Sequence, residues 1–73
     1  MENKMPRIEE LDLHGIKHED VDRLVENFVL LKSLPIRIIT GNSNKMRELV
    51  IEVLNRHDIE YEQFVSSHIT ILK

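Results

Sequence analysis

The chain is short, mildly acidic and free of cysteine, and these properties limit what it can be. Its 73 residues include 10 Lys and Arg against 13 Asp and Glu, giving a formal net charge of -3, and 41% of them are hydrophobic. A domain of this size buries only about 60% of the surface that its unfolded chain exposes, so a functional site must lie in a shallow groove. The absence of cysteine excludes disulfides, a thiolate nucleophile and cysteine-bound zinc.

No segment has the character of a signal peptide or a membrane span. Residues 1–6 contain no apolar stretch of signal-peptide length, and apolar runs elsewhere extend over only a few residues. We therefore expect a cytoplasmic protein without membrane contact, consisting of a flexible tail over residues 1–7 and a single domain over residues 8–73.

Charge is distributed unevenly along the chain. The net charge is -3 over residues 1–35, +2 over residues 36–57 and -2 over residues 58–73. An acidic protein is a poor general partner for nucleic acid, because phosphate contacts come mostly from Lys and Arg. Only the middle segment has the charge that such a partner requires.

The first expected element is a strand over residues 7–14. Leu11, Asp12, Leu13 and His14 alternate between apolar and polar, which is the pattern of a strand with one buried face. Since successive side chains of a strand point to opposite faces, the two leucines are expected in the core and Asp12 and His14 outside it.

Two amphipathic helices are expected, from residue 19 to about 32 and from residue 44 to about 56. Each repeats apolar residues at i, i+3, i+4, i+7 and i+8, the spacing of one helical face. Acidic residues favour the start of the first helix through its dipole. Ser43 or Asn44 can cap the second helix.

The remaining segments predict three further strands. Residues 36–40 are apolar on both faces, which favours a central strand, and residues 59–73 form two strands around a turn at Ser66 and Ser67. The order is βαβαββ. A right-handed crossover makes the first two strands parallel and places both helices on one face. We therefore expect an α/β fold of the α+β two-layer sandwich type, with a four-stranded mixed sheet.

Chemically useful residues gather at one edge of the expected sheet. Asp12 and His14 lie at the carboxyl end of the first strand, and Thr40 and Gly41 lie at the carboxyl end of its parallel neighbour. Ligands of open α/β sheets bind at this edge. We interpret it as the candidate site.

The loop beyond the second strand has features of a phosphate site. It leads into the N-terminus of a helix, where unpaired backbone amides attract anions. Lys45 and Arg47 add positive charge beside it. The expected phosphate-binding residues are Thr40, Gly41, Asn42, Ser43, Asn44, Lys45 and Arg47.

These residues resemble the two motifs of the Smr (small MutS-related) domain family. Residues 11–15 read LDLHG, the family's first signature, and residues 38–41 read IITG, where the family has a strand ending in Thr-Gly-x-Gly or His-Gly-x-Gly. The spacing, the intervening helix and the closing β segment agree over residues 8–73. The resemblance indicates a minimal, stand-alone form of the domain.

The resemblance implies a fold like that of the C-terminal domain of translation initiation factor three, binding to DNA or RNA, and endonuclease activity. Carried over by position, Asp12 and His14 would be the catalytic pair. The chain departs from the family pattern at Ser43, which replaces the second glycine. A noncatalytic nucleic-acid-binding module is therefore one alternative, and a small protein-interaction domain with a docking face on the open sheet is another.

A mechanism can be stated for the endonuclease. Imidazole titrates near neutral pH, so His14 can take a proton from water or from an RNA 2′-hydroxyl. Asp12 can orient it or hold a divalent cation such as Mg²⁺ or Mn²⁺. The structural alternatives are that His14 only hydrogen-bonds the turn and that Asp12 pairs with Arg37 on the same open face.

The other histidines and the aromatic residues suggest no further chemistry. His18, His57 and His68 lack metal-ligand spacing and are interpreted as surface or turn residues. Two Phe, one Tyr and no Trp are too few for recognition by base stacking. Recognition of DNA or RNA is therefore expected to be structure-selective, through the backbone, rather than sequence-specific.

Overall fold

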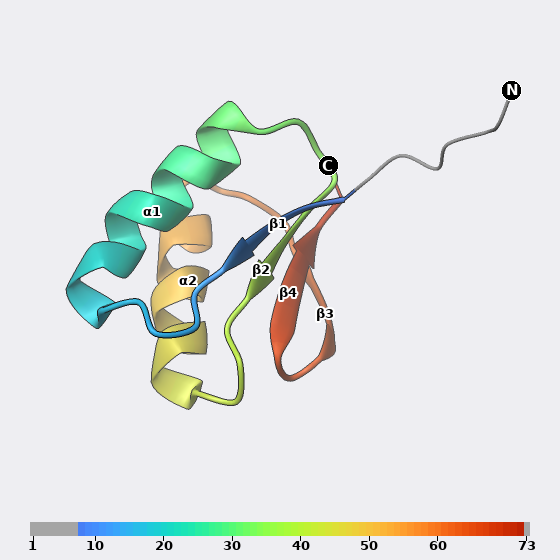
Figure 1. The fold of residues 1–73 in the computed structure, drawn as a ribbon. Coiled ribbons are helices and arrows are strands. Elements are labelled where there is room, and N and C mark those ends of the chain that lie inside the picture. The colour runs from blue at the N-terminus through green and yellow to red at the C-terminus, as the bar shows by residue number, and fades with distance from the viewer. Residues whose placement is uncertain (1–7, 73) are drawn as a thin grey trace, which may run out of the picture.

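The computed structural model describes residues 8–72, apart from the side chain of Phe64, and arranges them in the order βαβαββ (Figure 1). The elements are β1 (Glu9–Asp12), α1 (His18–Leu31), β2 (Ile36–Ile39), α2 (Asn44–Arg56), β3 (Glu62–Val65) and β4 (His68–Ile71). The tail expected over residues 1–7 lies outside the described residues, as does Lys73. Within the described range, neither helix combines the length and the apolar character needed to cross a membrane.

The four strands form one mixed sheet in the order β1-β2-β4-β3. β2 runs parallel to β1 and antiparallel to β4, and β3 is antiparallel to β4. Both helices cover the same face of the sheet, and the other face is open (Figure 1). The expected two-layer α+β sandwich, with a central β2 between parallel β1 and the closing hairpin, is therefore confirmed.

The core lies between the sheet and the two helices. Ile36 and Ile38 of β2 are completely buried toward the helices, while Arg37 and Ile39 are half-buried on the open face. The helices contribute the apolar stripes expected of them, because only that face of each helix meets the sheet. The fully buried side chains are Leu13, Val21, Val25, Ile36, Ile38, Val50, Val53, Leu54, Ile69 and Ile71.

β1 is shorter than the alternation predicts, since it ends at Asp12 and His14 lies in the following turn. Leu13 still meets β2, because its N–H donates to the carbonyl of Ile39 at 3.0 Å and its side chain is fully buried. Leu11 is only half-buried, which fits the position of β1 at the edge of the sheet. The alternation thus gives the inward direction of both leucines correctly but places the end of the strand wrongly.

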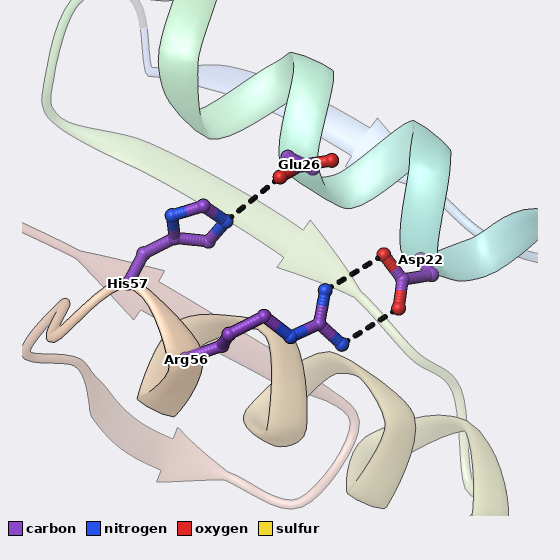
Figure 2. A network of polar contacts seen from close by, with 4 residues as sticks. All are labelled: Asp22, Glu26, Arg56 and His57. Atoms are coloured by element: carbon purple, nitrogen blue, oxygen red, sulfur yellow. Dashed lines mark hydrogen bonds and ion pairs between the residues drawn. The ribbon is translucent and has the colours of Figure 1, made fainter.

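Two polar contacts join α1 to α2 (Figure 2). Arg56 donates hydrogen bonds of 3.1 and 2.7 Å to the two carboxylate oxygens of Asp22, and Nε2 of His57 lies 2.9 Å from Oε2 of Glu26. The hydrogen bonds from Arg56 lower the pKa of Asp22, and Asp22 in turn raises the pKa of Arg56. These contacts link α1 to the C-terminal end of α2.

The pair between Asp22 and Arg56 should make stability depend on acid pH. Because the pKa of Asp22 is lower in the folded chain, its contribution is complete above the ordinary Asp pKa of about 3.9 and disappears as the pH falls through the folded value. Asp22→Asn is therefore expected to unfold at a lower urea concentration than the parent at pH 7, with the difference shrinking as the pH falls through the folded pKa of Asp22. Glu48→Gln, on the exposed side of α2, is the control. A difference that persisted in acid would contradict an electrostatic origin.

Candidate nucleic-acid interface

The loops after β1 and β2 bring the two sequence motifs into contact. His14 follows β1 and Gly41 follows β2, and the carboxyl ends of these parallel strands share one edge of the sheet. A Cβ atom placed on Gly41 would lie 3.5 Å from Cε1 of the His14 ring. The imidazole therefore lies directly against the backbone of the second motif.

Both glycines of the site have backbone angles that favour glycine. Gly15 has φ of 75° and Gly41 has φ of 67°, a region that L-residues with a Cβ atom rarely adopt. Apart from its chain neighbours, a Cβ placed on Gly15 would meet no described atom within 4 Å, whereas one on Gly41 would make ordinary van der Waals contact with the His14 ring. At both positions it is therefore the backbone angle, and not a lack of space, that favours glycine.

Asp12 and His14 form a local unit. Oδ1 of Asp12 accepts a hydrogen bond of 3.0 Å from the backbone N–H of His14 and lies 3.6 Å from Nδ1 of its ring. The side chains are 60% and 79% exposed, so a ligand can reach both. The alternative pairing of Asp12 with Arg37 is wrong, because the strand register places Glu10 beside Arg37 and these two form the ion pair, at 2.8 Å.

The second-motif loop is fastened to the turn between β3 and β4. The carbonyl of Ser67 accepts hydrogen bonds from the N–H groups of Thr40 and Gly41, at 2.8 and 3.0 Å. The Thr40 hydroxyl lies 3.1 Å from the carbonyls of both Ser67 and Gly41, and the residue is only 5% exposed. Of the expected phosphate-binding residues, Thr40 therefore supports the loop from within.

Ser43 caps α2, as one of the two residues expected to do so. Its hydroxyl accepts from the N–H of Met46 at 3.1 Å, and its carbonyl accepts from the N–H of Arg47 at 3.1 Å. The Arg47 guanidinium donates to the Ser66 carbonyl and to the side-chain oxygen of Asn44. The Arg47 guanidinium is therefore engaged by other groups of the protein, and it joins α2 to the β3–β4 turn.

Removal of the Ser43 cap should lower the free energy of unfolding of the domain. Ser43→Ala leaves the Met46 N–H without its acceptor and is expected to lower the free energy of unfolding by about 1 kcal/mol, whereas Ser43→Gly should cost about a few tenths of that. Urea denaturation measures both, with the exposed neighbour Asn42→Ala as the control. Equal losses from alanine and glycine would contradict the capping role.

The solvent-facing part of the expected phosphate loop is well defined. Gly41 is half-buried, and the exposed residues are Asn42, Ser43, Asn44 and Lys45. Lys45 lies in the first turn of α2, beside the backbone amides of the helix N-terminus. The loop therefore presents polar side chains and one ammonium group to solvent.

A divalent cation at this edge would draw few ligands from the protein. Among residues 8–72, no three His, Cys, Asp or Glu side chains lie together in a way that could hold a metal ion. Mg²⁺ is often bound through one or two carboxylates, with water and substrate phosphate as the other ligands. The exposed carboxylate of Asp12 fits that kind of site.

Two residues of the site were not found by sequence reasoning. Ser66 and Ser67 hold Arg47 and the second-motif loop through their carbonyl oxygens. Every residue type carries a carbonyl, so the residue types contain no signal for this role. Only the pairing of β4 with β2 brings the turn to this edge.

Comparison with known proteins bears on the fold. No family model matches the sequence, and no curated protein matches it. The structure is similar to the solution structure of the SMR domain of NEDD4-binding protein 2, with a TM-score of 0.64 and 17% sequence identity. The match covers 99% of this chain and 92% of that chain. The chain therefore has the fold of an SMR domain, which confirms at the level of the fold the resemblance seen in the two motifs.

Proposed function

We propose that the chain is a nucleic-acid-binding domain that cleaves phosphodiester bonds at the carboxyl edge of β1 and β2. The observation that carries this proposal is the position of the His14 imidazole, between the carboxylate of Asp12 and the backbone of Gly41. An exposed imidazole beside a carboxylate can act as a general base near neutral pH. The helix N-terminus that follows Gly41 favours the phosphate of the substrate.

The distribution of charge supports binding at this edge rather than across the open sheet face. The open face carries a row of paired positions that includes two glutamates. Arg37 pairs with Glu10 of β1 on one side and with Thr70 of β4 on the other, and Thr70 pairs with Glu62 of β3. Arg37 is already paired with Glu10, so this part of the face is acidic and repels phosphate. Lys17 and Lys45 lie beyond strand ends at the carboxyl edge.

Salt-dependent binding tests the position of the nucleic acid. Lys45→Ala should weaken binding and reduce the slope of log affinity against log salt by about one, because one phosphate contact is lost. Lys32→Ala removes the same charge after α1, at the opposite edge of the sheet, and should leave both quantities unchanged. Fluorescence anisotropy with a labelled RNA hairpin and a branched DNA measures them. Equal effects from the two variants would contradict this binding edge.

Cleavage assays separate the proposal from its nearest alternative. Purified protein is incubated with structured RNA, branched DNA and supercoiled plasmid, with Mg²⁺, Mn²⁺ or EDTA. We expect cleavage of at least one substrate. Salt-sensitive binding without cleavage would instead support a noncatalytic module, which is favoured by the serine at position 43. Absence of salt-sensitive binding would overturn both.

A further inference from the structure

A second histidine, His68, lies on the same face of the sheet as Asp12 of the candidate catalytic pair. The register pairs Asp12 with Ile39 and Ile39 with His68. Side chains at paired positions point to the same face, and neighbouring strands are about 4.8 Å apart, so His68 follows Asp12 at about 10 Å across the open face. His68 is half-buried and begins β4.

The His14 ring reaches toward the end of β2, the strand that lies between β1 and β4. It lies against Gly41, which follows β2, and its Nδ1 is 3.6 Å from Oδ1 of Asp12. The N–H of Gly41 is bonded to the carbonyl of Ser67, which directly precedes His68. His14 and His68 therefore lie at the ends of β1 and β4, on the two sides of β2, where the two imidazoles can flank a single phosphate.

We propose that His68 is the general acid of the cleavage reaction, that His14 is its general base, and that the substrate is RNA. This inference rests on the function proposed above. RNA carries its own nucleophile, so two imidazoles are sufficient to move both protons of the reaction. His68 would then be a catalytic residue, contacting the leaving oxygen.

The proton transfers balance without another reactant. Asp12 lies beside Nδ1 of His14, so Nε2 of His14 takes the proton of the 2′-hydroxyl. The O2′ atom attacks phosphorus, the bond between phosphorus and O5′ breaks, and the His68 imidazolium gives its proton to O5′. The products are a 2′,3′-cyclic phosphate and a 5′-hydroxyl, with His14 left protonated and His68 neutral.

The other histidines of the described residues lie outside the sheet, although His18 follows Lys17 at the same carboxyl edge. His18 begins α1, and His57 follows the far end of α2, where it contacts Glu26. Neither belongs to the row that joins Asp12 to His68. His57→Ala is therefore a matched control, because it removes a histidine from the opposite edge of the sheet.

An RNA with sulfur in place of the bridging O5′ atom tests the role of His68. A thiolate leaves without needing a proton, so the modified substrate makes a general acid unnecessary. We expect His68→Ala to cleave ordinary RNA about 10²- to 10⁴-fold more slowly than the parent, but to approach the parental rate on the sulfur substrate. His14→Ala should be slow on both substrates, and His57→Ala should match the parent on both.

Each result supports or overturns the inference. If the parent cleaves nucleic acid but His68→Ala keeps the parental rate on ordinary RNA, or is equally slow on both substrates, His68 is not the acid while the proposed function stands. Cleavage of DNA alone overturns the RNA assignment. If the parent cleaves neither RNA nor DNA, the proposed function fails and this inference fails with it. Should His68→Ala not fold, as judged by circular dichroism, His68→Gln is expected to give the same pattern.

Discussion

Replacement of His14 by alanine is expected to slow phosphodiester cleavage by about 10²- to 10⁴-fold, because the reaction loses its general base. The His14 side chain is 79% exposed, so the free energy of unfolding should change by no more than about 0.5 kcal/mol. The measurements are the single-turnover cleavage rate and the urea midpoint of the same preparation. A loss of activity with an unchanged midpoint identifies a functional role rather than a structural one.

Asp12→Asn separates the hydrogen bond that the Asp12 side chain accepts in the turn from the negative charge that it places beside the His14 ring. Asparagine keeps a side-chain oxygen that can accept from the His14 N–H, as Asp12 does at 3.0 Å, but it carries no charge beside the imidazole. We expect the turn to be retained and the rate to fall. Parental rates for both His14→Ala and Asp12→Asn would place the reaction elsewhere on the molecule.

Ile38→Ala is expected to lower the free energy of unfolding by about 2–5 kcal/mol, since it removes a buried side chain and leaves a cavity. Ile38 is 0% exposed and lies on the central strand between Leu11 and Ile69. A domain of this kind has about 5–15 kcal/mol in total, so the variant should be partly unfolded at moderate temperature. Circular dichroism during urea and thermal denaturation gives the value.

Its neighbour Ile39 provides the matched comparison. Ile39 lies on the same strand, but it faces the open side of the sheet and is only half-buried. Ile39→Ala should therefore cost clearly less than Ile38→Ala. Similar costs would mean that both faces of β2 are covered, which contradicts a two-layer arrangement.

Hydrophobic periodicity predicts which face a side chain points to better than it predicts which residue of the adjacent strand the side chain contacts. It identified both helices, the central β2 strand and the inward positions of Leu11 and Leu13. It could not show that Arg37 pairs with Glu10 rather than Asp12, because these two carboxylates lie two residues apart on the same face and a two-residue shift of register would exchange them. It also extended β1 into the turn, since Leu13 stays buried after the strand has ended.

The candidate site was predictable where it depends on strand ends and motifs. Parallel β1 and β2 were enough to bring His14 toward Gly41. The support from Ser67 and the position of His68 depend on how β4 pairs with β2. That pairing joins residues far apart in the chain, and the residue types at the β3–β4 turn do not specify it.

The hydrogen bonds to the Ser67 carbonyl also set the order in which the site can form during synthesis. Asp12, His14 and Gly41 are all translated before β4, yet the second-motif loop is held only when the closing hairpin has docked beside β2. Such long-range pairing forms late, because loop closure precedes the contacts that reward it. The second-motif loop is therefore fully supported only once β4 has docked beside β2.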